Sequence, residues 1–150
     1  MTTQLPRDAD GKLIPHDDPG IQQDHWLIRR IHDKLVVEDG SGGRRISSLA
    51  FKSSNGELSV DLQNMIERAG LDAAVYVTTS RWLGAIRFQA GPVRKLGFKI
   101  GADPTPENPY HGCVWGVRTR AQQEALRGLA EWFVPMNGVS IARTSGAPSG

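Results

Sequence analysis

The first half of the chain shows short apolar runs separated by turn-forming residues, the pattern of a small sheet. Residues 26–32 predict a strand that enters the core, and residues 45–51 predict a second strand. The glycine-rich loop between them indicates a hairpin. Asn55-Gly56 is a strong turn signal because both residues adopt positive backbone angles at little cost. It should link the second strand to a short third strand at 58–60, as antiparallel neighbours.

The second half mixes helical and extended patterns. Apolar residues at helical spacing over 62–69, followed by Gly70, predict a helix with a left-handed cap. The β-branched run 73–79 predicts a strand, as does 85–89, whereas 92–96 predicts a helical turn closed by Gly97. Proline-rich residues 103–109 should form a loop, and 111–118 a final strand.

Thr119 marks the start of the last predicted helix. Gln122 follows it at the spacing of a capping box, in which each residue bonds to the backbone of the other. The apolar stripe of this helix consists of Ala125, Leu126, Leu129, Trp132 and Phe133. Such a stripe should pack against the sheet.

Together these elements predict an α+β fold, with a mostly antiparallel or mixed sheet and two or three helices in one domain. The folded unit should span residues 26–135. Residues 1–25 are rich in Asp and Pro and predict a mobile acidic arm, and residues 136–150 predict a flexible tail.

Composition narrows the functional classes only slightly. The 150 residues contain 18 Lys and Arg against 16 Asp and Glu, so the net charge of +2 identifies no partner. A single cysteine, Cys113, forms no internal disulfide, and no secretion signal is recognisable at the start, so we expect a cytoplasmic protein. The apolar runs are too short to cross a membrane.

Histidine is the first candidate for chemistry because its pKa lies near neutrality. His16 and His25 lie in or beside the predicted mobile arm, which does not hold side chains in a fixed arrangement, so we set both aside. His32 ends the first strand and either bonds to a loop or contributes to a site. His111 is the leading candidate catalytic residue, since it follows a proline-bounded loop and starts a strand.

Cys113 should share a strand face with His111 and Trp115. A thiolate–imidazole pair would need the backbone to bend, because residues two apart in a strand are about 6–7 Å apart. A buried cysteine packed beside a tryptophan needs fewer assumptions. With one cysteine and no close histidine pair, the sequence predicts no metal site and no cofactor.

Arg30, Ser48 and the two histidines His32 and His111 form the candidate catalytic set. Arg29 or Arg30 on the first strand, then Ser47, Ser48 and Phe51, resemble the opening of ADP-ribosyltransferase-type toxins, which bind NAD with such residues. The resemblance covers about a fifth of the chain. The catalytic glutamate of that family has no clear counterpart among three later glutamates, which are Glu107, Glu124 and Glu131.

A broader resemblance is to uncharacterised small bacterial α+β proteins. It rests on Arg30-Ile31, on 47–51 with the pattern Ser-Ser-x-Ala-Phe, on 58–60, and on 108–111 with the pattern Asn-Pro-x-His. It implies a bacterial origin and carries no activity.

Every charged residue from 81 to 99 is basic. Candidate contacts to nucleic acid or to a protein partner are Arg81, Trp82, Arg87, Arg94, Lys95 and Lys99. Cations would bind phosphates while the aromatic ring stacks on a base. An ordinary solvated basic face is the simpler alternative, because neighbouring positions on a strand face opposite ways.

Three functional hypotheses follow. The first is a bacterial interaction module that binds a protein partner in a multi-protein system. The second is a small effector enzyme, of toxin or defence type, acting on NAD or RNA, which requires the catalytic set to converge in one cleft. The third is a nucleic-acid-binding module that uses the basic stretch.

Overall fold

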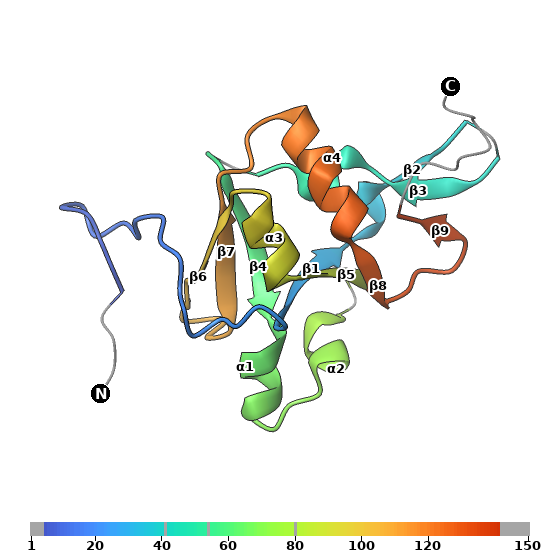
Figure 1. Cartoon of the computed structure of the whole chain (residues 1–150). Coiled ribbons are helices and arrows are strands. Elements are labelled where there is room, and N and C mark those ends of the chain that lie inside the picture. The colour runs from blue at the N-terminus through green and yellow to red at the C-terminus, as the bar shows by residue number, and fades with distance from the viewer. Residues whose placement is uncertain (1–4, 41, 54, 80, 142–150) are drawn as a thin grey trace.

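The computed structural model describes residues 5–40, 42–53, 55–79 and 81–141, and Figure 1 shows the arrangement. Four α-helices and nine strands form an α+β fold in this described part, as predicted. The elements in chain order are β1 (Trp26–Ile31), η1 (Asp33–Leu35), β2 (Val36–Glu38), β3 (Arg44–Ile46), η2 (Ser48–Phe51), β4 (Glu57–Leu62), α1 (Gln63–Arg68), α2 (Ala73–Val77), β5 (Gly84–Gln89), α3 (Ala90–Lys95), β6 (Lys99–Ala102), β7 (His111–Trp115), α4 (Arg120–Leu129), β8 (Glu131–Val134) and β9 (Val139–Ser140).

Six strands make the main sheet, in the order β6-β7-β4-β1-β5-β8, and all the pairings are antiparallel. A second sheet, β2-β3-β9, lies beside it, with β9 parallel to β3. The α3 and α4 helices cover one face of the main sheet (Figure 1) and enclose the larger core, which includes Phe51, Phe88 and Leu126. The α1 and α2 helices pack with Ile28 and Ala85 on the other face.

Several local predictions are confirmed. The capping box of α4 is present, with the Thr119 hydroxyl accepting from Gln122 N and the Gln122 side chain accepting from Thr119 N. Gly70 and Gly97 have positive φ angles of 81° and 97° after α1 and α3. These features depend on neighbouring residues alone, and so the sequence specifies them directly.

Other predictions are wrong. Residues 73–77 form the α2 helix instead of a strand, because the side chain of Asp72 accepts from Val75 N and caps a helix. The predicted strand at 45–51 is only β3; the hydroxyl of Ser47 caps the 3-10 helix η2. The α4 helix ends at Leu129, which leaves Trp132 and Phe133 in β8 instead of the helical stripe.

The predicted strand pairings are also wrong. The first strand does not form a hairpin with the second; β1 lies between β4 and β5, and the glycine loop joins β2 to β3 instead. β4 pairs with β1 and β7, in a different sheet from β3.

The segment predicted to be an arm contacts the sheet at several points in its described part. Leu13 and Ile21 are buried, and Asp18 N donates to Ile100 O at the β6 edge, where Figure 1 shows the blue segment passing the sheet. In the predicted tail, residues 139–140 form β9, whereas 142–150 lie outside the described residues.

Candidate functional site

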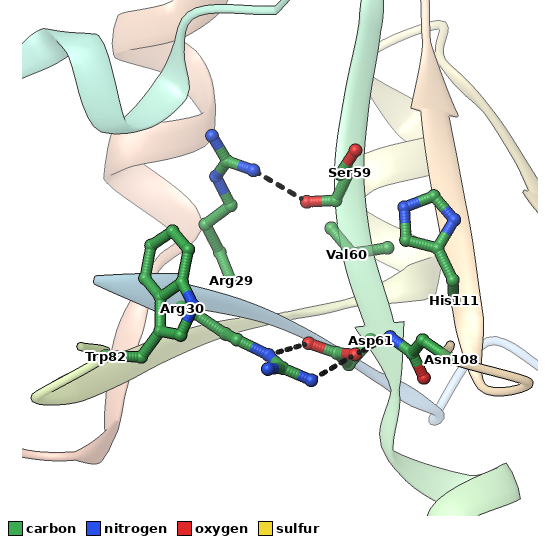
Figure 2. Close-up of a pocket in the computed structure, with 8 residues that line it drawn as sticks. All are labelled: Arg29, Arg30, Ser59, Val60, Asp61, Trp82, Asn108 and His111. Atoms are coloured by element: carbon green, nitrogen blue, oxygen red, sulfur yellow. Dashed lines mark hydrogen bonds and ion pairs between the residues drawn. The ribbon is translucent and has the colours of Figure 1, made fainter. Parts of the chain in front are cut away.

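A split in the main sheet creates the candidate site. β1 and β4 pair at only two positions, Leu27 opposite Leu62 and Ile28 opposite Asp61. Beyond Ile28, β1 stays paired with β5, and β4 stays paired with β7. β1 and β4 therefore diverge from each other. A cavity of about 260 Å³ occupies this gap. Its lining residues, drawn in Figure 2, are Arg29, Arg30, Ser59, Val60, Asp61, Trp82, Asn108 and His111.

Arg29 closes the gap from the β1 side. Its Nη1 donates to Ser59 O on β4, and its Nε donates to Ala50 O in η2, both at 2.9 Å. These bonds supply donors to two backbone carbonyl groups at the edge of the gap, one in β4 and one in η2. Burial lowers the pKa of Arg29 from its ordinary value, whereas the charge of Asp61 acts in the opposite direction. In the described part of the chain, no carboxylate forms an ion pair with Arg29.

Asp61 organises the opposite side of the cavity. It is buried, and its two carboxylate oxygens accept from Arg30 Nε at 2.8 Å and Arg30 Nη2 at 3.1 Å (Figure 2). Asn108 Nδ2 also donates to Asp61, at 2.7 Å. The orientation of the Asn108 amide is set by Tyr76, whose hydroxyl donates to Oδ1 at 2.6 Å. Arg30 therefore has a carboxylate partner, unlike Arg29.

His111 faces the cavity from β7. It lies opposite Asp61 in the β4–β7 ladder, so the two side chains share a face of the sheet. Its Nδ1 lies 2.8 Å from Asp103 O and 3.4 Å from the Asp103 carboxylate. Figure 2 shows the other ring nitrogen directed toward β4 and the cavity. Cys113 is buried next to it, and burial and the Asp103 charge raise the pKa of this thiol to about 12.

The structure brings together part of the predicted catalytic set. Arg30 and His111 line the same cavity, together with Trp82 from the predicted basic stretch. Ser48 is not among the residues that line the cavity; it lies in η2. His32 is adjacent, with its ring 4.9 Å from that of Trp82, and its Nδ1 accepts from Lys34 N.

The remaining basic residues are dispersed over the surface. Arg87 pairs with Glu131 and stacks on Trp26, at 4.0 Å from the ring centroid. Arg94 pairs with Asp17 of the N-terminal segment. Arg81, Lys95 and Lys99 are exposed. Of this group, only Trp82 lines the cavity.

Sequence reasoning missed Ser59, Asp61 and Asn108. A signal was present for Asp61, because a charged residue between Val60 and Leu62 within a strand must face away from the core they enter. The roles of Ser59 and Asn108 depend on the β1–β4 split, for which the sequence gives no local sign.

Comparisons with known proteins yield no relative: no family model, no curated protein and no solved structure matches the chain. In the described residues, no helix is both long and apolar enough to cross a membrane.

Proposed function

We propose that the cavity between β1 and β4 binds the phosphate group of a nucleotide, as the substrate site of a small effector enzyme. The observation that carries this proposal is Arg29, a half-buried cation at the cavity wall whose hydrogen bonds, among the described residues, go to the neutral carbonyls of Ser59 and Ala50. Its burial lowers its pKa. An anion in the cavity would offset the unfavourable burial of that charge. The neighbouring Arg30 is already neutralised by Asp61.

The other cavity residues support a nucleotide over a simple inorganic anion. Trp82 adds a half-buried aromatic wall, on which a base can stack. His111 directs a ring nitrogen inward, within the same space. A cavity of about 260 Å³ is small for a drug-sized ligand and suits one nucleotide unit, with the rest of a larger substrate outside.

Calorimetry with AMP, adenosine, NAD and a short single-stranded RNA tests the proposal. AMP should bind, and adenosine, which lacks the phosphate, should bind at least about tenfold more weakly, because charged hydrogen bonds contribute roughly 1.5–3 kcal/mol. Arg29→Met should weaken AMP binding by roughly tenfold to a hundredfold. Arg120→Met, at an exposed position on α4, is the matched control and should bind like the wild type.

The same experiment distinguishes the sources of the phosphate. Preferential binding and turnover of RNA or of NAD, followed by chromatography of the products, would identify the substrate. Equal affinity for AMP and adenosine, or a folded Arg29→Met chain with unchanged affinity, would refute the proposal. In that case the prediction of an interaction module, which needs no ligand in this cavity, would become the stronger hypothesis.

A further inference from the structure

Three side chains of different ligand chemistry meet beside the cavity, where β6 ends and β7 begins. They are the carboxylate of Asp103, the imidazole of His111 and the thiol of Cys113, and their ligand atoms all lie within 4.8 Å of one another. Cys113 is buried, and the other two side chains are half-buried. The cluster joins a strand to a proline-rich loop.

We propose that this cluster is a zinc site, in which Asp103, His111 and Cys113 bind Zn²⁺ through Oδ2, Nδ1 and Sγ. This mixture of sulfur, nitrogen and oxygen donors suits Zn²⁺, which accepts all three and is bound tetrahedrally. Sequence reasoning predicted no metal site because it counted cysteine and histidine spacing alone. The pairing of β6 with β7, which Asp103 continues by donating its N–H to His111 O, supplies the missing carboxylate ligand.

The distances fit a tetrahedron before any metal is added. Zinc bonds of about 2.3 Å to sulfur and about 2.0–2.1 Å to nitrogen and oxygen give edges of about 3.5 Å between S and O, and about 3.3 Å between N and O. The observed separations are 3.6 Å between Cys113 Sγ and Asp103 Oδ2, and 3.4 Å between His111 Nδ1 and Asp103 Oδ2. Two edges of the polyhedron are thus already formed.

A fourth donor lies next to the cluster. Nε2 of His16 is buried and, among the described residues, has no hydrogen-bond partner. Its Nδ1 contacts Ile14 O at 2.9 Å; when Nδ1 donates there, a lone pair remains on Nε2, as in most zinc-bound histidines. An added Cβ at Gly101 would lie 2.5 Å from this Nε2, and Gly101 is directly opposite Cys113 in the β6–β7 ladder. The His16 imidazole therefore lies over the same face of the sheet as Cys113, although its Nε2 is not among the ligand atoms that lie within 4.8 Å of one another. We assign it the fourth position, which it would reach by moving toward the bound metal.

Binding would replace protons with metal bonds. The Cys113 thiol releases its proton to solvent and binds as thiolate. His111 binds through an Nδ1 lone pair, so its ring proton lies on the cavity-facing Nε2 and the metal bond replaces the present contact of Nδ1 with Asp103 O. The zinc would also attach the N-terminal segment to the sheet through His16. Zinc binding at this site requires only the named side chains and does not depend on nucleotide binding in the cavity.

Titration of the untagged, metal-free full chain with Co²⁺ and Zn²⁺ tests the site. We expect one metal per chain, a thiolate-to-Co²⁺ charge-transfer band that Zn²⁺ abolishes, and a higher melting temperature with Zn²⁺. Cys113→Ser should lose the band. Asp103→Asn and His16→Gln should each lower Zn²⁺ affinity by at least about tenfold. His25→Gln, at another histidine of the same segment, is the matched control and should bind like the wild type.

Asp103→Asn changes a half-buried carboxylate with little change in volume, so it keeps the test valid if Cys113→Ser does not fold. Failure of the wild type to bind Co²⁺ at micromolar concentration would overturn the proposal. So would a bound Co²⁺ without a thiolate band, or unchanged affinity in Asp103→Asn. Unchanged affinity in His16→Gln would overturn the assignment of the fourth ligand.

Discussion

Asp61 is the carboxylate on which the polar side of the cavity depends, and Asp61→Asn tests this directly. The substitution preserves the size of the side chain and removes its charge. Asp61 is 4% exposed, and it accepts from Arg30 at 2.8 and 3.1 Å and from Asn108 at 2.7 Å. In the variant, an amide NH₂ group replaces one of these acceptors and faces donors instead.

The expected loss of unfolding free energy is about 2–3 kcal/mol. Breaking a fully buried ion pair costs about 3–5 kcal/mol, because the remaining charge is left without a partner. The Arg30 side chain is 22% exposed, so water can solvate part of its charge, and we take a value below that range. Arg30 also lies over the Tyr76 ring, at 5.5 Å from its centroid, a contact that the variant keeps.

Urea unfolding of the wild type, Asp61→Asn, Arg30→Met and the double variant measures both the loss and the coupling between the two residues. We expect the double variant to be more stable than the sum of the single effects implies, by at least about 1 kcal/mol. Asp72→Asn is the matched control, because asparagine caps a helix about as well as aspartate. A loss below about 0.5 kcal/mol in Asp61→Asn, or additive single effects, would refute the reasoning.

Three further predictions concern stability. Gly84→Ala should destabilise the chain by roughly 1–3 kcal/mol in urea unfolding, because the new Cβ would lie 2.9 Å from Val134 O, a backbone atom that cannot turn aside; an unchanged midpoint would contradict this. Thr119→Ala should lose about 1 kcal/mol with the capping box, measured by thermal unfolding, whereas Thr119→Ser should lose little. The folded Cys113 thiol has a pKa of about 12 against 9.0 when exposed, so the folded state holds a proton that the unfolded state releases. The unfolding free energy of the metal-free wild type should therefore be unaffected by this thiol below about pH 9 and fall by at most about 1.4 kcal/mol per pH unit above it. In Cys113→Ala the unfolding free energy should fall less steeply between about pH 8 and pH 10. Equal slopes in the two proteins would contradict the raised thiol pKa.

The sequence predicted features whose causes are local. The Thr119 capping box and the glycines after α1 and α3 depend on residues within one turn, and all are confirmed. The β-branched run at 73–77 misled the prediction because strand propensity there is weaker than the cap that Asp72 provides and the burial of Ala73 and Val77 on one helical face.

The candidate site was predictable only in part. Titratable character and position beside a loop indicated His111, which lines the cavity, and the arginines of the first strand were also singled out. Their meeting point depends on which strands pair, and the sequence alone placed β1 next to β3 instead of between β4 and β5. The carboxylate of Asp103 likewise lies near Cys113 only because β6 pairs with β7 and Asp103 continues that pairing opposite His111.

The position of β1 has a consequence for the kinetics of folding. It is the first long strand of the chain, and yet its main partner is β5, so that Trp26 lies opposite Gln89. During synthesis β1 can pair with β4 at only two positions, and the rest of β1 has no strand partner until β5 has emerged. The other edge of β4 has no strand partner until β7 has emerged. Closing such long loops slows folding. The cavity, whose walls come from β1, β4 and β7, therefore forms late, and a nascent chain that ends before residue 111 has no site.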